Sequence, residues 1–405
     1  MIIFIYPIIF DSTVNEIFNE SSMIQKKQWI WEDENYPDFE YDIEKIMPKM
    51  LSIARKQGEL VSLSKILGTR HLQKGQLNAL ENEILASSAI EGEFLDRESV
   101  KSSIKEKLGI ESVQHYKRKS KESCYVDVLL DANKSYKEPL TLKRIFSWHL
   151  AMFEKQHKSL WDIEVGDFRK KGTMQIVSGV VGKEKVFYEA PPAASLQSEM
   201  NTFLEWFNTT PHSLIKAAVA HLWFVIIHPF DDGNGRMTRA ITDSVLSGIE
   251  DANGIRLYSM SKSINSNRKS YYKALERTTG YIPKKRQMDI TDWLEWFMNT
   301  LELSLDDALC SIEYVVQKTA FWDIHKDKPL NSRQRTVLNA ILDQDAEVLE
   351  TGLSTKKYLK LANTTSATAS RDIKSLVSLG CISQVEGTSG RNIRYELVFE
   401  STDNI

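Results

Sequence analysis

Cysteine is scarce in this chain. Its 405 residues include three cysteines, Cys124, Cys310 and Cys381, which lie far apart in the sequence. A disulfide framework needs more cysteines, and a zinc site needs ligands at short, regular spacing. The sequence therefore predicts neither, and we expect the protein in a reducing compartment, the cytoplasm.

An excess of charge of one sign is also lacking. The chain has 52 lysines and arginines against 55 aspartates and glutamates, a formal net charge of -3 at pH 7. Proteins that coat nucleic acid or an acidic membrane carry a clear basic excess, so this class is excluded for the chain as a whole. A basic face confined to one domain stays compatible. With 42% hydrophobic residues, the length favours a soluble protein of two or three domains.

No apolar run is long enough for a membrane span. The first ten residues, MIIFIYPIIF, are apolar, but they contain Pro7 and are followed by Asp11 and Glu16. A spanning helix needs about 20 apolar residues, and a secretory signal begins with basic ones. We therefore expect residues 1–26 to form a tail, or a strand packed on the body of the protein, and we expect no membrane partner.

Helical periodicity dominates the chain up to about residue 320. Segments such as ITDWLEWFMNTLELSLDDAL repeat apolar residues at i, i+3 and i+4. One segment, MQIVSGVVGKEKVFYEAPP, alternates instead and predicts a β-hairpin from Met174 to Phe187. The predicted fold class is mainly α, a helical bundle with one hairpin. The expected domains are a tail (1–26), an N-terminal helical domain (27–114), a central core (115–320) and a C-terminal domain (326–400).

The pattern of the C-terminal domain predicts a winged helix-turn-helix. Two short helices, a break at Gly380 and a hairpin follow one another, and Asn363 or Thr364 is the expected cap of the second helix. The sequence is compatible with two kinds of partner for this domain, DNA or another protein. For DNA, the expected contacts are Ser366, Thr368, Arg371 and Lys374 from the second helix and Arg391 and Arg394 from the wing. Asp372 and Glu386 stand among these residues and count against DNA.

The densest group of chemically active residues is HPFDDGNGRMTR, residues 228–239. Glycines on either side of Asn234 allow backbone angles that turn successive N–H groups toward an anion. A helix follows, and its N-terminus directs positive charge at the same place. Arg236 and Arg239 are three residues apart on that helix and can reach the same side. Together these features predict a polyphosphate site.

Two further residues complete this group. A carboxylate such as Asp232 beside phosphates needs a divalent cation between them, and Mg²⁺ is the usual one. His228, at the end of the preceding apolar helix, is the obvious proton acceptor. The alternative is a helix-loop-helix corner whose arginines form surface ion pairs. The joint arrangement makes that alternative the weaker one.

The motif resembles that of the Fic family, HPFxDGNGRxxR, and every fixed position is present. The resemblance extends over residues 115–320, including the hairpin and the segment SYYKAL. It implies a small helical bundle with a β-hairpin flap, and transfer of AMP from ATP to a Ser, Thr or Tyr hydroxyl of a target protein. The segment WIWEDENYPDFEYD also resembles an N-terminal domain often found before bacterial Fic cores. One position departs, since many relatives carry glutamate where this chain has Val225.

The resemblance implies a role for each motif residue. His228 would be the general base, Asp232 would hold Mg²⁺, and Phe230 would anchor the loop. The nucleotide would be bound by Gly233, Asn234 and Gly235 as the anion cradle, with Asn234 near the α-phosphate, by Arg236 and Arg239 at the β- and γ-phosphates, and by Tyr272 in the nucleotide pocket. A core position is nearly as good an interpretation of Tyr272. The target protein would dock on the flap by strand pairing.

A candidate brake precedes the core in SSAIEG, residues 87–92. Ser87 and Glu91 are four apart, on one face of a helix that Gly92 ends. By itself, a glutamate near a helix end is usually solvated. The resemblance changes this interpretation, because many Fic proteins carry an inhibitory helix with the pattern S/T-x-x-x-E-G/N. It implies that Glu91 pairs with Arg239 and restrains transfer until a regulatory event releases it.

Two alternatives to restrained AMP transfer stay open. The Fic core could sense nucleotide while the winged helix delivers a transcriptional output, or the same site could remove AMP, with Glu91 orienting a water. The intact His228 favours catalysis over sensing, because nucleotide binding alone needs no base. The family often pairs, so monomer and homodimer both stay open, as does the identity of the target.

Overall fold

The computed structural model describes residues 7–8, 29–110, 121–153, 163–170, 173–178, 185–250, 256–280, 288–343 and 352–399. The chain divides into two compact units, an N-terminal unit of residues 1–309 and a C-terminal unit of residues 310–405. Within the described ranges, no helix is long and apolar enough to cross a membrane.

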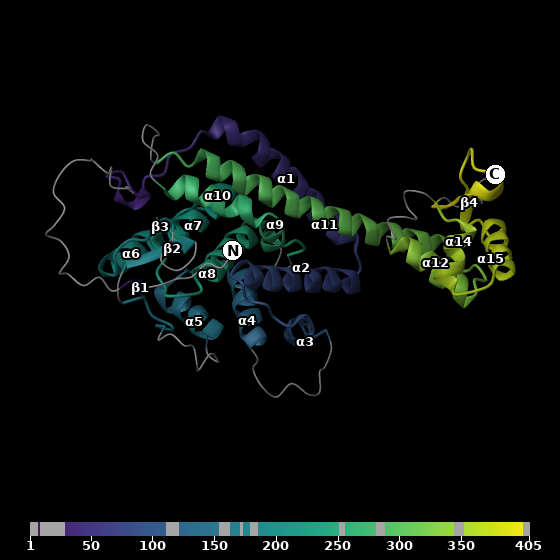
Figure 1. Ribbon diagram of the computed structural model, residues 1–405, viewed down its shortest axis with the longest axis horizontal. Coiled ribbons are helices and arrows are strands. Elements are labelled where there is room, and N and C mark those ends of the chain that lie inside the picture. Colours follow the sequence, from purple (N-terminus) through teal and green to yellow (C-terminus); the bar gives the residue numbers. More distant parts are fainter. Residues whose placement is uncertain are drawn as a thin grey trace. The chain divides into compact units, whose positions relative to one another are not determined.

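The N-terminal unit is mainly helical, as the sequence predicts, with a small antiparallel sheet (Figure 1). Its helices are α1 (Ile43–Ile66), α2 (Thr69–Ile90), α3 (Arg97–Lys107), α4 (Lys121–Lys134), α5 (Leu142–Phe153), α6 (Leu196–Thr209), α7 (Leu214–Ile227), α8 (Asn234–Glu250), α9 (Met260–Ser266), α10 (Arg268–Thr279) and the first part of α11 (Thr291–His325). Its strands are β1 (Pro7–Ile8), β2 (Thr173–Ser178) and β3 (Lys185–Glu189).

Helix α7 forms the centre of this unit. Its sequence LIKAAVAHLWFVII is apolar on nearly every side, and every residue except Ile215 is buried. A helix without a polar face is stable only when neighbours cover it all round. Here α6 and α8 pack against it. The motif that joins α7 to α8 is therefore held against the core of the unit.

The predicted hairpin is present as β2 and β3. The strands are antiparallel, with Ser178 opposite Lys185 and one bulge in the register; the turn, 179–184, lies outside the described residues. On its other edge β2 pairs with β1, with Pro7 opposite Met174. The sequence predicts either a tail or a packed strand for residues 1–26, and β1 is such a packed strand. The other residues of this segment lie outside the described ranges.

Helix α2 carries the predicted brake and packs against α3, α4, α8 and α9. It ends at Ile90, and Gly92 follows with a φ of 81°, a left-handed conformation that glycine adopts without strain. Two turns before this end, the buried Glu83 carboxylate accepts hydrogen bonds from Ser259 Oγ (2.8 Å) and from the Ser261 N–H (3.1 Å) at the start of α9. These bonds fix α2 onto the bundle that holds the motif.

The C-terminal unit follows the predicted order of helices and hairpin. Its elements after α11 are α12 (Ser332–Leu342), α14 (Thr355–Ala362), α15 (Ser366–Ser378), β4 (Ile382–Gln384) and β5 (Tyr395–Leu397). β4 and β5 pair antiparallel, and Leu353 forms a bridge to Tyr395. Apolar residues from every helix and from β4 share one core, among them Phe321, Leu338, Tyr358, Ile373 and Ile382. The order of elements agrees with the predicted pattern, and the winged helix-turn-helix assignment itself stays a prediction.

The predicted cap of α15, Asn363 or Thr364, is wrong. Thr365 caps this helix, because its Oγ1 accepts a hydrogen bond from the Thr368 N–H at 3.4 Å. Asn363 instead ends α14 with a φ of 45°, a left-handed position that asparagine tolerates. The recognition-type helix therefore begins at Ser366.

Asp372 does not lie on the exposed side of α15, where the sequence analysis counts it against DNA. It is only 4% exposed. Its carboxylate accepts hydrogen bonds from Arg333 Nε (3.0 Å), Asn331 Nδ2 (3.2 Å) and Tyr358 Oη (3.1 Å). The aspartate joins α12, α14 and α15, and its charge is neutralised inside the unit.

Candidate active site

The loop 228–233 leaves α7 in a strained conformation. His228 has a φ of 47°, which is unusual for a residue with a side chain, and its N–H closes the last turn of α7. At the other end of the loop, Gly233 has a φ of 81°. A Cβ on Gly233 would lie 2.7 Å from the ring of Phe153, so only glycine fits this place. The loop is therefore held in one shape by its own sequence and by α5.

Asn234 fixes the loop from within. Its Oδ1 accepts a hydrogen bond from the Phe230 N–H (3.0 Å), and its Nδ2 donates one to the Phe230 carbonyl (2.7 Å). Phe230 itself is fully buried, as expected for an anchor, and stacks on His149 with ring centroids 4.0 Å apart. The amide of Asn234 is thus engaged with the loop, and its place beside the α-phosphate stays a prediction.

His228 is held as a neutral base. Its side chain is buried, and burial, followed by the nearby charge of Arg169, lowers its pKa to about 4. Nδ1 lies 3.3 Å from the Val225 carbonyl, which accepts only if Nδ1 carries the proton. That tautomer leaves Nε2 as a proton acceptor at neutral pH. Val225, which stands where many relatives carry glutamate, therefore helps to orient the His228 ring through its backbone carbonyl.

Arg169 is a residue that the sequence analysis missed. It is 1% exposed, and its Nε donates to the His228 carbonyl at 2.9 Å. Nη2 donates to the Pro191 carbonyl, at the end of the flap. Its own N–H donates to the carbonyl of Pro229 at 3.0 Å. The guanidinium therefore clamps the backbone of His228 in its left-handed conformation. A lone arginine in a loop gives no signal of this in the sequence.

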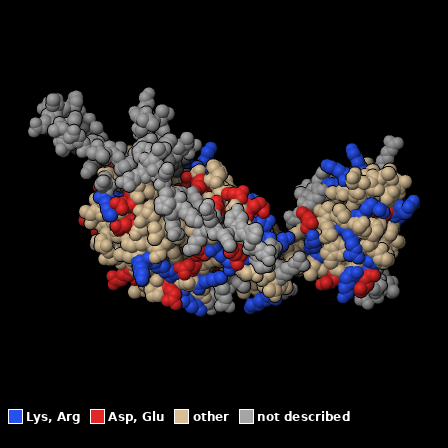
Figure 2. All heavy atoms as spheres, turned by 90° about the horizontal axis from the view of Figure 1, so that it is seen from below, with Lys and Arg blue, Asp and Glu red and all other residues tan. Residues whose placement is uncertain are grey.

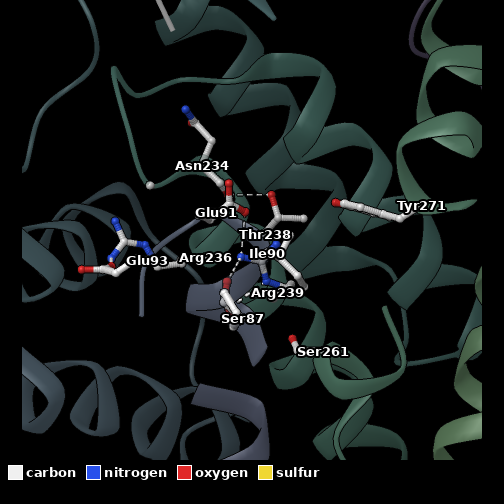
Figure 3. A network of polar contacts seen from close by, with 12 residues as sticks. Ser87, Ile90, Glu91, Glu93, Asn234, Arg236, Thr238, Arg239, Ser261 and Tyr271 are labelled. Atoms are coloured by element: carbon white, nitrogen blue, oxygen red, sulfur yellow. Dashed lines mark hydrogen bonds and ion pairs between the residues drawn. The ribbon is translucent and has the colours of Figure 1, made fainter. Parts of the chain in front are cut away.

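Each of the two motif arginines is paired with a glutamate that follows α2 (Figure 3). Arg239 donates from Nη2 to Glu91 Oε1 at 2.8 Å, and its Nε donates to Ser87 Oγ at 2.7 Å. Arg236 donates from Nη1 to Glu93 Oε2 at 2.8 Å. The structure thus brings Ser87 and Glu91 onto Arg239, the contact that the Fic resemblance implies. It adds Glu93, which the sequence analysis did not single out.

The Glu91 carboxylate also lies against the predicted anion cradle. A Cβ on Gly235 would lie 1.9 Å from Glu91 Oε1. Burial works against a charge on Arg239, but the attraction of Glu91, together with smaller contributions from Tyr125 and Tyr271, outweighs it and raises the pKa of that arginine. One carboxylate therefore already occupies the place where cradle and arginine meet.

The site offers unused donors for an anion. Arg236 Nε and Arg239 Nη1 are buried and have no hydrogen-bond partner among the described residues. A buried guanidinium nitrogen without an acceptor is costly. A polyphosphate supplies acceptors on several sides, so the donor set fits such a ligand better than a single carboxylate.

Asp232 lies beside this cradle. Its Oδ1 accepts from the Gly233 N–H at 2.6 Å, and its carbonyl accepts from His149 Nε2 at 3.0 Å. No group of three or more His, Cys, Asp or Glu side chains that could hold a metal occurs among the described residues. Mg²⁺ binds through one or two carboxylates, substrate phosphates and water, so Asp232 is the residue that would hold it. His149, a second residue that the sequence analysis missed, fixes the loop at Asp232.

Tyr272 lies next to the end of α2. Its hydroxyl donates to the Ile90 carbonyl at 3.3 Å, and burial, followed by the charge of Glu91, raises its pKa to about 12. Its neighbour Tyr271 is the buried one, with its hydroxyl 3.0 Å from His221 Nε2. Tyr272 is therefore the tyrosine of the pair that faces the brake, and its part in nucleotide binding stays a prediction.

Comparison with known families identifies the central region. The sequence model of the Fic/DOC family matches residues 139–246. These residues are therefore similar to a Fic domain. Residues 29–110 match a second family, described as a domain of unknown function (DUF4172). The Fic match covers α5 to most of α8, and so contains the hairpin, the motif and both motif arginines; α2 and its two glutamates lie in the other match.

Named relatives align with part of the chain. The chain is 27% identical over 204 residues to a "Protein adenylyltransferase Fic" of Nematostella vectensis, which covers 48% of this chain and 43% of the relative. It is 27% identical over 184 residues to the protein of that name from Aedes aegypti, covering 43% of this chain and 34% of the relative. The chain thus spans less than half the length of these relatives.

Solved structures give weaker likenesses. A Fic family protein from Desulfovibrio desulfuricans G20 is 19% identical, with a TM-score of 0.46, covering 87% of this chain and 96% of that one. A Fic domain-containing signaling protein from Bacteroides thetaiotaomicron is also 19% identical, with a TM-score of 0.44, covering 64% of this chain and 97% of that one. The assignment of the Fic domain depends on the sequence match.

Proposed function

We propose that this protein is a protein adenylyltransferase, which moves AMP from ATP to a hydroxyl of a target protein and is restrained by Glu91. The observation that carries the proposal is a neutral, buried His228 at the start of the loop that joins α7 to α8. The glycine cradle that follows it and the two arginines of α8 fit a polyphosphate. The Fic domain and the name of its curated relatives support the same reaction. ATP is then the substrate.

The chain's residues divide the reaction between them. Nε2 of His228 takes the proton from the target hydroxyl, whose oxygen forms a bond to the α-phosphorus of ATP. The bond from that phosphorus to the bridging oxygen breaks, and pyrophosphate leaves with its negative charge held by Arg236 and Arg239. Asp232 would hold Mg²⁺, which neutralises phosphate charge when bound. Positioning and charge neutralisation therefore carry most of the catalysis, and a positioned base adds about 10²- to 10⁴-fold.

Glu91 acts as a brake by competing with ATP. Its carboxylate takes one donor of Arg239 and fills the space above Gly235. A charge-assisted hydrogen bond contributes about 1.5–3 kcal/mol, which corresponds to roughly a 10- to 100-fold restraint. Glu91 is 31% exposed on its side chain, so a shift of the end of α2 can remove it without unfolding the core.

The target would dock on the β2–β3 flap by adding a strand. β1 already pairs with β2 at Thr173 and Met174. A segment that docks on the β2 edge therefore either pairs beyond these two residues or displaces β1. The hydroxyl that receives AMP would lie on that segment, on a serine, threonine or tyrosine.

Autoradiography with α-³²P-ATP and Mg²⁺ tests this function. The three proteins are the wild type, Glu91→Gly, and Glu91→Gly combined with His228→Ala, each with and without cell lysate. We expect label on protein that rises with the first change and disappears with the second. No label in any of the three, with ATP binding confirmed, would overturn AMP transfer.

We also propose that the C-terminal unit binds duplex DNA, because Asp372, one of the two acids among the predicted contacts, is turned inward. The other acid, Glu386, is exposed in the loop between β4 and β5. Arg371 and Lys374 are exposed on α15, and Lys356 and Lys360 on α14. Basic side chains are spread over the face of this unit that Figure 2 shows. The charge that remains outward on these helices is therefore positive, as phosphate contacts require.

Fluorescence anisotropy with a labelled 20-base-pair duplex at several salt concentrations tests this binding. Phosphate contacts predict an affinity that falls steeply as salt rises, and a further loss in Arg371→Ala and Lys374→Ala. Binding that is absent at low salt, or unchanged in both variants, would favour a protein partner for this unit.

A further inference from the structure

We propose that Glu93 is a second brake, which holds Arg236 as Glu91 holds Arg239. The proposal depends on the nucleotide transfer proposed above, because it assigns a regulatory role at the same site. Glu93 Oε2 lies 2.8 Å from Arg236 Nη1, the same separation as between Glu91 Oε1 and Arg239 Nη2. Both arginines expected at the β- and γ-phosphates are thus neutralised by carboxylates from one short segment.

The turn after α2 places both carboxylates on the site. The Gly92 N–H donates to the Ala89 carbonyl at 3.0 Å, and the Glu93 N–H donates to the Ser88 carbonyl at 2.9 Å. This turn needs the left-handed φ of 81° at Gly92. The chain therefore reverses between the two glutamates, and each reaches a different arginine on α8.

Arg236 lies where an anion is strongly favoured. Its side chain is 6% exposed, its Nε has no hydrogen-bond partner among the described residues, and its guanidinium lies 4.8 Å from the ring centre of Phe153. A charged group buried to this degree requires a counter-charge. Glu93 supplies that charge in this state, and the phosphates of ATP would have to replace it.

Both glutamates belong to the segment at the end of α2, but they occupy hydrogen-bond donors of different arginines. Glu91 alone can leave Arg239 while Glu93 still holds Arg236, and the reverse holds as well. Full access for ATP therefore requires the whole end of α2 to move, or both carboxylates to be removed. A protein without Glu91 is then only partly released.

A set of glutamine variants measures the second brake. Glu91→Gln, Glu93→Gln and the double variant each remove charge at nearly constant shape. Glu98→Gln is the matched control, since Glu98 is a nearby glutamate exposed in the first turn of α3. Isothermal titration with Mg²⁺-ATP gives the Kd, and α-³²P-ATP labelling gives the rate, so binding and transfer are read separately.

We expect Glu93→Gln to bind ATP about tenfold more tightly than Glu98→Gln, the effect of removing one charge-assisted competitor. The double variant should bind about tenfold more tightly, and label faster, than Glu91→Gln alone. Glu93→Asp keeps the charge but draws the carboxylate back, and it should fall between the wild type and Glu93→Gln.

The outcomes separate the two proposals. If Glu93→Gln binds ATP as Glu98→Gln does, and the double variant matches Glu91→Gln within about twofold, Glu93 is no brake, whatever the labelling shows. If Glu93→Gln tightens ATP binding but no variant labels protein, the second brake holds at the level of binding and AMP transfer fails. Circular dichroism of each variant confirms that the fold is retained.

Discussion

The Glu91 carboxylate lies 2.8 Å from Arg239 Nη2 and at the same time covers the backbone of Gly235. One side chain therefore meets both elements that the sequence assigns to a polyphosphate, the cradle and the second arginine. Because these places coincide, ATP and the brake compete for one volume. A regulatory event needs only to move the end of α2 to release both at once.

Substitution of Gly235 tests the cradle itself. Gly235 has no left-handed φ, so Gly235→Ala is compatible with the backbone of α8. The atoms in the way of the new methyl group are the ends of two side chains, the Glu91 carboxylate and Arg239 Nη1 at 3.1 Å, so the protein should still fold. In a Glu91→Gly background, the methyl group takes the room of the anion, and we expect the Kd for Mg²⁺-ATP to rise about tenfold.

The matched control for this variant is Gly58→Ala in α1. A Cβ at Gly58 meets no atom within 4 Å, so this change should leave ATP affinity untouched. Titration calorimetry of the two variants in the same background compares them directly. Equal affinities would show that no anion uses the space above Gly235.

Local features of this fold could be predicted from the sequence, and distant pairings could not. The apolar α7, the glycine-bounded loop and the arginines of α8 are consecutive, so spacing and composition suffice to place them near one ligand. Glu93 and Arg236 are 143 positions apart, and their contact depends on how α2 packs on α8. In the sequence, only the turn predicted at Gly92 indicates that Glu93, like Glu91, lies near the arginines of α8.

The pH dependence of transfer tests the role of Arg169. Burial and the charge of Arg169 both lower the pKa of His228, to about 4, so the base is neutral at every pH above roughly 5. In a Glu91→Gly background we expect labelling to stay level from pH 8 down to about pH 6. Arg169→Gln keeps a donor for the His228 carbonyl but removes the charge. Its acid limb should therefore begin at a higher pH.

Lys170→Gln is the control for this change. Lys170 is the next residue, it is exposed, and its ammonium group forms ion pairs with Glu164 and Asp167. It should leave the acid limb where it is. A profile of initial labelling rates from pH 5 to 8, with circular dichroism at each pH, makes the comparison. If Arg169→Gln lowers the rate equally at all pH values, the arginine supports only the shape of the loop.

Buried histidines make the stability of the N-terminal unit depend on pH. Burial lowers the pKa of His149 to about 4, while an unfolded histidine has a pKa of about 6.5. As the pH falls from 6.5 to 4, the unfolded chain takes up a proton that the folded chain does not. The free energy of unfolding therefore falls in this window, by up to about 1.4 kcal/mol per pH unit for each such histidine.

His149→Gln removes the contribution of this one histidine to the pH dependence of stability. Glutamine can still accept from the Gly166 N–H and donate to the Asp232 carbonyl, as His149 does. Urea unfolding between pH 4.5 and 7 should show a shallower loss of stability in this variant than in the wild type. Parallel slopes in His149→Gln and wild type would contradict the buried neutral state.

Asp372 shows why composition misleads about a binding face. In the sequence it stands between Arg371 and Ile373, and nothing tells an exposed acid from a buried one. In the structure its neighbour Arg371 points to solvent, while Asp372 accepts bonds from α12 and α14. The helical period turns adjacent residues about 100° apart, and the partners that make an inward acid stable come from other helices.

Removal of this carboxylate separates stability from DNA binding. In Asp372→Ala, the buried Tyr358 hydroxyl loses its acceptor and Arg333 loses its partner, so we expect the C-terminal unit to lose about 2 kcal/mol of stability. Below its melting temperature, its affinity for a duplex should stay near that of the wild type, because the residue faces inward. Lys374→Ala should do the opposite, keeping stability and weakening DNA binding. Thermal unfolding and anisotropy on both variants decide the matter: a marked gain of DNA affinity in Asp372→Ala at full folding would place the acid on the binding face after all.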